Sequence, residues 1–256
     1  FTIPNLLTLG NLFCGCLALI TLFTFRSEIT NDAPEHLSSN IYIIAILILL
    51  SASLLFDLLD GMVARAMKIN SEIGVQLDSL ADMVTFGLIP GIIMFLMLDG
   101  VLPLYYKSNG FITTLNLPWL PLLGLFITLF SALRLAKFNV DTEQSTYFKG
   151  LNTPANTILI FSLFWIQNQN GFIVSKEFDL YILIGITLIS CWLLISNIPI
   201  FSFKLKGFGW KDNHYKYVFL IISILLLVLF QMNSVPFIIL IYIILSIIFK
   251  KKIIHA

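Results

Sequence analysis

Long apolar stretches recur along all 256 residues of this sequence, and they constrain its fold more than any other feature. An apolar helix needs about 20 residues to cross a bilayer. Because lipid offers the backbone no hydrogen-bond partners, such stretches are expected to be helical. Only 11% of the residues are charged, against about 25% in soluble domains. We therefore predict an all-α, polytopic transmembrane helical bundle that forms a single integral-membrane domain over residues 1–256. The expected helical segments are 5–25, 41–64, 78–98, 117–137, 154–170, 178–198, 215–231 and 235–250.

The fifteen Lys and Arg residues predict how this bundle is oriented. If the N-terminus is cytoplasmic, only Arg26, Lys107 and Lys176 fall in outer loops. An excess of cations on the inner side is typical of membrane proteins, so both termini are expected inside. The twelve inner cations are Arg65, Lys68, Arg134, Lys137, Lys149, Lys204, Lys206, Lys211, Lys216, Lys250, Lys251 and Lys252.

Several classes of protein and site are disfavoured by composition. The net charge of +1 gives no global field for nucleic acid, so no nucleic-acid partner is expected. Cys14, Cys16 and Cys191 all lie in apolar runs and are interpreted as small core residues rather than disulfide or zinc ligands. The first apolar run lacks the basic start and small-residue cleavage site of a signal peptide, so it is expected to remain as a span.

Four aspartates carry the main chemical signal. Asp57 and Asp60 are three residues apart on one expected helix, and Asp78 and Asp82 are four apart on the next, so each pair shares a helical face. A carboxylate at membrane depth costs roughly 2.5–3.5 kcal/mol, so these groups must be paired, hydrated or metal-bound. The short linker between the helices predicts antiparallel neighbours with facing acidic surfaces near the cytoplasm.

Four converging aspartates suit Mg²⁺ or Mn²⁺ better than Zn²⁺, which prefers nitrogen and sulfur ligands. We predict that Asp57, Asp60, Asp78 and Asp82 hold metal, with two ions that clamp a pyrophosphate. Arg65 lies beside them and is suited to a bidentate phosphate contact. The alternative is that the aspartates only cap helix ends or pair with nearby Arg and Lys side chains.

The same stretch resembles the signature of the CDP-alcohol phosphotransferase family, D-x2-D-G-x2-A-R-x8-G-x3-D-x3-D. This resemblance implies a six-helix membrane core, usually a homodimer, that binds a CDP-linked lipid from the cytoplasmic side. The core would cover about residues 1–200, with about two additional C-terminal helices at 215–250. The eight signature positions are Asp57, Asp60, Gly61, Ala64, Arg65, Gly74, Asp78 and Asp82, without departure.

Roles for individual residues follow from the resemblance. It implies that Asp57, Asp60 and Asp78 are metal ligands, and that Asp82 lies near the metals and deprotonates the acceptor hydroxyl. Asn5 and Thr8 either donate to the nucleotide phosphates or are ordinary helix-start residues. The expected nucleotide-binding residues are Asn5, Thr8, Asp60, Gly61, Ala64, Arg65, Gly74 and Asp78.

Residues 3–15, 78–90, 132–139 and 148–155 are similar to the serine-using branch of the family, the prokaryotic phosphatidylserine synthases. This implies CDP-diacylglycerol as donor, L-serine as acceptor and the prokaryotic cytoplasmic membrane as location. The serine carboxylate needs a cation or donor cluster, and Arg134, Lys137 and Asn139 are the predicted acceptor-binding residues. For the two cations, the competing interpretation is ordinary inner-side anchoring.

Other functions stay open. The same chemistry with glycerol 3-phosphate, inositol phosphate or an amino alcohol needs only a different acceptor site, although the start of the third span offers no extra cation for a phosphorylated one. An archaeal lipid donor is also compatible, since the signature reads the CDP head. An ion-coupled transporter would be expected to show two repeat halves, and the acidic motif occurs once.

Overall fold

The computed structural model describes residues 2–30, 37–68, 71–108, 119–140, 147–171, 173–175, 178–202 and 210–254. Most described residues of each expected apolar segment are helical. The helix in the segment at 178–198 ends at Ile195, helical structure in the segment at 117–137 begins at Pro121, and residues 117–118 lie outside the described residues. The helices are α1 (Ile3–Thr30), α2 (Leu37–Met67), α3 (Glu72–Asp82), α4 (Ile89–Ser108), α5 (Leu125–Val140), α6 (Thr153–Asn170), α7 (Asp179–Ile195), α8 (Trp210–Phe230), α9 (Val235–Ile248) and α10 (Lys250–Ile254). Shorter elements are the π-helix η1 (Met83–Leu88), the 3-10 helices η2 (Pro121–Gly124) and η3 (Gln231–Ser234), and strands β1 (Tyr147–Lys149) and β2 (Pro199–Phe201).

Several of these helices can cross a membrane. Within the described residues, five segments are long and apolar enough, and α7 is a shorter apolar helix. The chain is therefore a polytopic helical membrane protein. Eight separate crossings remain a prediction, because α8 and α9 fall in one apolar segment. The five segments are Ile3–Ser27, Asn40–Met67, Glu72–Val101, Pro121–Val140 and Asn213–Ile248.

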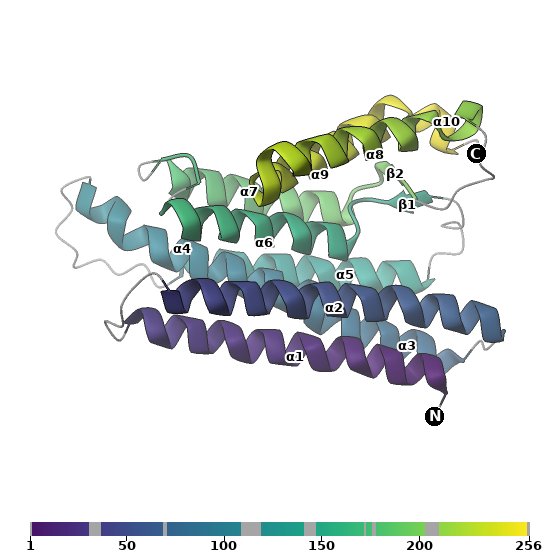
Figure 1. The fold of residues 1–256 in the computed structure, drawn as a ribbon, viewed down its shortest axis with the longest axis horizontal. Helices are drawn as coiled ribbons and strands as arrows, with labels where there is room; N and C mark the ends of the chain where they lie inside the picture. Colours follow the sequence, from purple (N-terminus) through teal and green to yellow (C-terminus); the bar gives the residue numbers. More distant parts are fainter. Residues whose placement is uncertain are drawn as a thin grey trace.

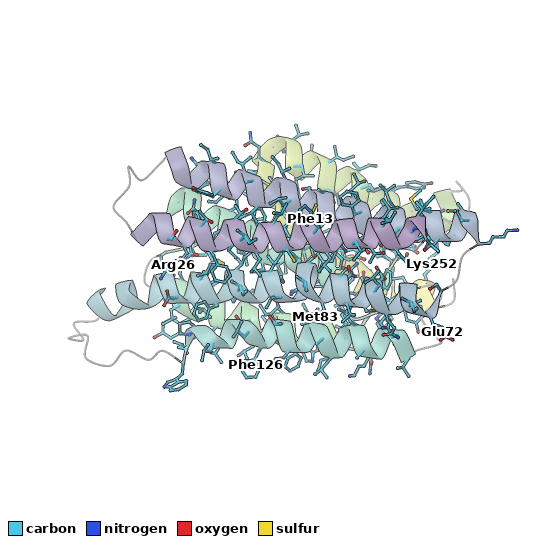
Figure 2. All side chains as sticks on the ribbon, turned by 90° about the horizontal axis from the view of Figure 1, so that it is seen from below. Phe13, Arg26, Glu72, Met83, Phe126 and Lys252 are labelled. Carbon is cyan, nitrogen blue, oxygen red and sulfur yellow. The ribbon has the colours of Figure 1, made fainter. Side chains whose placement is uncertain are left out.

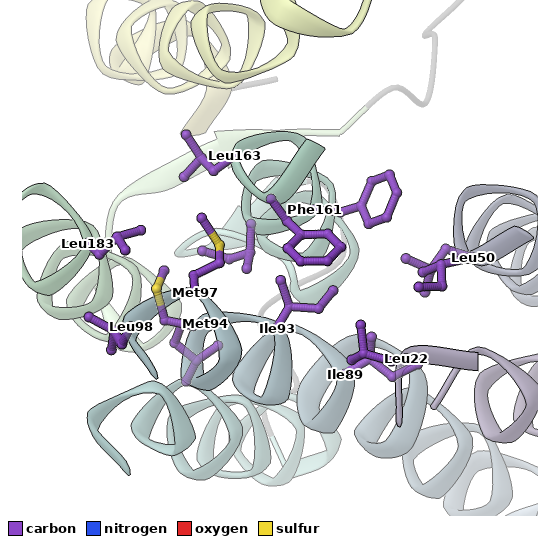
Figure 3. Close-up of a cluster of buried hydrophobic side chains, with 14 of the residues drawn as sticks. Leu22, Leu50, Ile89, Ile93, Met94, Met97, Leu98, Phe161, Leu163 and Leu183 are labelled. Atoms are coloured by element: carbon purple, nitrogen blue, oxygen red, sulfur yellow. The ribbon is translucent and has the colours of Figure 1, made fainter. Parts of the chain in front are cut away.

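The helices form a bundle around a long central helix (Figure 1). Helix α3, the π-helix η1 and α4 follow one another without interruption from Glu72 to Ser108. Helices α1 and α2 pack together along their length, while α5, α6 and α7 surround α4. Buried apolar side chains such as Ile93, Met97, Phe161 and Leu183 meet between these helices (Figure 3). Because lipid is as apolar as these side chains, close packing rather than water exclusion holds them together.

The two ends of the bundle differ in character. The N-terminus, β1, β2 and the C-terminal helix lie at one end (Figure 1), which we call the motif end. Glu72 and Lys252 lie there, whereas Arg26 lies at the opposite end, where it pairs with Asp99 (Figure 2). Most of the predicted inner cations belong to elements that meet at the motif end. Lys176, Lys204 and Lys206 lie outside the described residues, and which side of the membrane this end faces remains a prediction.

A small sheet corrects the all-α expectation. Strands β1 and β2 pair antiparallel, with Tyr147 opposite Phe201. Three-residue strands beside Gly150 and Pro199 are too short to leave an alternating pattern in sequence. The sheet anchors the C-terminal hairpin of α8 and α9, because Tyr242 donates a 2.7 Å hydrogen bond to the Phe201 carbonyl.

Candidate active site

Three aspartates converge at the motif end. One carboxylate oxygen from each of Asp57, Asp60 and Asp78 lies within 4.8 Å of the other two. The first two come from α2 and the third from α3, so the acidic faces of these helices do turn toward each other, as predicted. Asp60 is buried, the other two are half-buried, and Asp78 Oδ1 is buried without a hydrogen-bond partner.

The ion-pairing alternative is not supported for these carboxylates. Within the part of the chain that the structure describes, Asp57, Asp60 and Asp78 form no ion pair, whereas Arg26 pairs with Asp99 at the opposite end. The Arg65 guanidinium instead folds back near Gly61, where a side-chain carbon would lie 3.6 Å from it. Three clustered carboxylates with an orphaned buried oxygen suit a hard divalent cation, which prefers oxygen ligands.

Helix α1 packs against both α2 and α3 and supplies side chains to the cluster. Thr8, which is buried, donates a 2.7 Å hydrogen bond to Asp60 Oδ2. Asn11 is fully buried, and its Nδ2 donates to Asp82 Oδ1 at 3.1 Å. The α1 helix therefore positions carboxylates on both neighbouring helices.

The backbone of Asn11 connects α1 to both α2 and η1. Its carbonyl oxygen accepts from Ser53 Oγ on α2 at 3.1 Å and from Thr85 Oγ1 on η1 at 3.4 Å. One turn further along α1, a side chain on Gly15 would collide with Thr85. This close approach requires glycine, and it lets α1 lie directly against η1.

Asp82 stands apart from the three converging carboxylates. It is the last residue of α3, where the π-helix η1 begins. Short π-helical turns are rare and often mark functional sites. Carbonyl oxygens of η1 accept from neighbouring helices: Phe86 O from Thr157 of α6, and Gly87 O from Thr128 of α5, both at 3.1 Å. A metal-ligand role for Asp82 remains a prediction.

The predicted nucleotide-binding residues lie around this cluster on α1, α2 and α3. A side chain on Gly74 would come within 3.2 Å of Asn5 Oδ1, so α1 and α3 approach closely there. Ser71 caps α3 by accepting from the Gly74 backbone N–H at 3.1 Å. Ala64 is half-buried and Arg65 is exposed.

The predicted acceptor residues separate in the structure. Arg134 of α5 is buried and lies within electrostatic range of Asp82. Lys137 is exposed and lines a cavity of about 60 Å³ with Arg134 and Lys149. Asn139 instead donates a 2.8 Å hydrogen bond to Ser79 of α3. Asn139 follows Arg134 by five residues, a spacing that does not return to the same side of a helix. The two side chains therefore leave α5 on different faces.

Sequence reasoning assigned no role to several buried polar residues. Asn11 on α1, Ser131 on α5 and both Thr153 and Asn156 on α6 are buried polar side chains. The available signal was a polar side chain inside an apolar run, which is weaker than a carboxylate because it costs less to bury.

This fold and site define a polytopic helical membrane protein. At one end of its bundle it carries a cluster of carboxylates that could hold a metal ion. The family model described as CDP-alcohol phosphatidyltransferase matches residues 1–250, and the chain belongs to that family. It is therefore a transferase of phospholipid biosynthesis, and the resemblance seen in the sequence is confirmed.

Characterised relatives are similar over much of their length. The chain is 29% identical to a protein of Helicobacter pylori strain J99 over 206 residues, which cover 80% of the chain and 73% of that protein. It is 33% identical to a Methanocaldococcus jannaschii protein over 174 residues, 66% of the chain and 75% of that protein. It is 31% identical to a Bacillus subtilis protein over 153 residues, 59% of the chain and 69% of that protein. All three relatives are named CDP-diacylglycerol–serine O-phosphatidyltransferase.

Proposed function

We propose that this protein transfers the phosphatidyl group of CDP-diacylglycerol to L-serine, giving phosphatidylserine and CMP. The observation that carries the choice of acceptor is the buried Arg134, which lies within electrostatic range of Asp82. A buried guanidinium needs an anionic partner, and the carboxylate of free serine supplies one next to the proposed base. The names of the relatives support the same acceptor.

Asp57, Asp60, Asp78 and Asp82 are proposed to hold Mg²⁺ or Mn²⁺, as two ions. The converging oxygens of the first three and the orphaned Asp78 Oδ1 support this assignment. When bound, the ions neutralise charge that develops on the phosphate oxygens.

Asp82 is the proposed general base, and Asn11 orients it through the 3.1 Å hydrogen bond to Oδ1. Asp82 takes the proton of the serine hydroxyl while the serine oxygen forms a bond to the lipid-linked phosphorus. The bond from that phosphorus to the CMP oxygen breaks, and CMP leaves with the electron pair. A carboxylate is a weak base for an alcohol, so orientation and charge stabilisation must supply much of the rate.

The donor's nucleotide is proposed to bind between α1, α2 and α3, with Arg65 on a phosphate. The proposed contacts are Asn5, Thr8, Asp60, Gly61, Ala64, Arg65, Gly74 and Asp78. An apolar cavity of about 210 Å³ opens beside Leu54 of α2, Phe86 of η1 and Ile158 of α6. Its apolar lining and its place next to the helix of Asp57 suit an acyl chain of the donor.

Arg134, Lys137 and Asn139 are the proposed acceptor-binding residues. Arg134 would pair with the serine carboxylate, and Lys137 would add positive charge beside it. Asn139, bonded to Ser79, would act at the rim between α5 and α3. The cavity that joins Arg134, Lys137 and Lys149 also suits a phosphorylated acceptor such as glycerol 3-phosphate or inositol phosphate, which makes these the second candidates.

We place the active site on the cytoplasmic side of the prokaryotic cytoplasmic membrane, since the predicted inner cations belong to elements of the motif end. The catalytic core is proposed to cover about residues 1–200, with the helices at 215–250 as additions. A homodimer is the assembly expected from the family.

The test is CMP release by the purified protein with CDP-diacylglycerol, Mn²⁺ or Mg²⁺ and one acceptor per reaction. Release with L-serine alone is expected. Release only with glycerol 3-phosphate, inositol phosphate or an amino alcohol would keep the transferase chemistry and overturn the choice of acceptor.

A further inference from the structure

Four buried polar side chains on α5 and α6 carry atoms that no hydrogen bond satisfies within the described residues. They are Ser131 Oγ, Arg134 Nε, Thr153 Oγ1 and both amide atoms of Asn156. Arg134 is 8% exposed and the other three are 0% exposed. A buried polar group without a partner costs about 1–3 kcal/mol, and a polar ligand that reached these four residues would offset that cost.

Helices α5 and α6, which carry the four residues, both pack against η1. The Ser131 Cβ lies 3.2 Å from where a side-chain carbon on Gly87 would be. On the other side, Thr157 of α6 donates to the Phe86 carbonyl. Ser131 thus lies against η1 from α5, and Thr157 lies against it from α6.

One helical turn toward the motif end, Arg134 and Thr153 reach the level of Asp82, whereas Asn156 adjoins Thr157 and its side chain leans toward that level from the helix N-terminal direction. On α5, Arg134 follows Ser131 by three residues and shares its face. On α6, Thr153 precedes Thr157 by four residues, and the Thr153 backbone carbonyl accepts a hydrogen bond from the Thr157 hydroxyl. Asn156 follows Thr153 by three residues. One turn of helix advances about 5.4 Å. One turn before Phe86 and Gly87, the chain is at the start of η1, directly after Asp82.

The chemistry of these groups is that of an amino-acid site. Arg134 provides positive charge for a carboxylate. The carbonyl oxygen of Asn156 and the hydroxyl of Thr153 can accept from an ammonium group, which is a donor only. The amide nitrogen of Asn156 can donate to the carboxylate at the same time. A neutral amide at position 156 adds no negative charge that would compete with the substrate carboxylate for Arg134.

We propose that Asn156 and Thr153 bind the α-ammonium group of the acceptor, and that Asn156 thereby selects an α-amino acid over alcohols that lack the amine. This assignment rests on the proposed function, because it takes serine as the acceptor. It adds to Arg134 two residues to which sequence reasoning assigned no role.

The experiment compares L-serine with 3-hydroxypropionate, which is serine without the ammonium group. Steady-state CMP release is measured for the wild type, Asn156→Leu and Thr153→Val. A site that hydrogen-bonds a substrate group discriminates strongly against analogues that lack it, so the wild type is expected to prefer L-serine. In both variants KM for L-serine rises about tenfold or more, with KM for CDP-diacylglycerol within about twofold, and the preference over 3-hydroxypropionate falls by a similar factor.

Thr157→Val is the matched control, because it makes the same chemical change at a hydroxyl already bonded to Phe86 O and Thr153 O. It is expected to lower the unfolding temperature and to leave the preference for L-serine unchanged. Asn156→Ser, which keeps a small polar group, provides the measurement if the leucine variant does not fold.

Two failures are distinguishable. A wild type that releases CMP only with a phosphorylated alcohol overturns the proposed function and this assignment with it. A wild type that uses L-serine, with variants at 156 and 153 that keep its KM and its preference over 3-hydroxypropionate, overturns this assignment alone.

Discussion

The side-chain amide of Asn11 on α1 donates a 3.1 Å hydrogen bond to Oδ1 of Asp82, the last residue of α3. Asn11 is fully buried, and its backbone carbonyl accepts hydrogen bonds from Ser53 and Thr85. The contact with Asn11 therefore holds the Asp82 carboxylate in one orientation. In the proposed function, the other oxygen takes the proton of the acceptor hydroxyl. The first helix thus acts as the positioning element for the proposed base.

Replacing Asn11 with Ala should lower kcat by roughly tenfold to a hundredfold and change both KM values little, because the loss is one of orientation. Ser53→Ala removes a bond to the Asn11 backbone and leaves its side chain in place, so this control should affect thermal stability more than kcat. An Asn11→Ala enzyme with wild-type kcat would show that Asp82 needs no support from α1.

Asp82→Asn should abolish CMP release while CDP-diacylglycerol still binds. The amide keeps the shape of the side chain but cannot take a proton at ordinary pH. Binding is measured as the shift in unfolding temperature that CDP-diacylglycerol causes in detergent. Normal turnover by this variant would remove Asp82 as the base.

Divalent metal should raise the unfolding temperature of the purified protein, since a ligand that binds only the folded state stabilises it. Removal of metal with EDTA should abolish CMP release, and Mn²⁺ or Mg²⁺ should restore it. Asp78→Asn should lose most of the metal-dependent shift.

The matched control for the metal experiment is Asp99→Asn, which breaks the pair with Arg26 at the opposite end of the bundle. It is expected to alter basal stability and to keep the full metal-dependent shift. Equal shifts in the two variants would contradict a metal site at Asp57, Asp60 and Asp78.

Gly15→Ala should destabilise the protein by about 1–3 kcal/mol, the range typical of overpacking, because the added carbon meets Thr85. Gly185→Ala is the comparison, since a side chain there has no atom within 4 Å and alanine is the better helix former by about 1 kcal/mol. The readout is the unfolding temperature in detergent. A Gly15→Ala protein as stable as the Gly185→Ala protein would mean that α1 and η1 can separate without cost.

Much of this protein follows from the sequence because the deciding rules are local. Lipid forces each apolar run to be a helix, and the helical period places Asp57 and Asp60 on one face and brings Asp78 and Asp82 onto another. The short connection after Arg65 makes the two acidic helices antiparallel. These rules suffice for the bundle class and for the facing carboxylates.

Tertiary packing decided the rest, because contacts between separate helices depend on how closely their backbones approach. Gly15 lets α1 reach η1, and only that approach brings Asn11 to Asp82. The rotation of α5 turns Arg134 inward while Asn139 bonds to Ser79. The fully buried Asn156 carries an amide in an apolar helix, and only the folded chain shows that its amide atoms have no hydrogen-bond partner among the described residues.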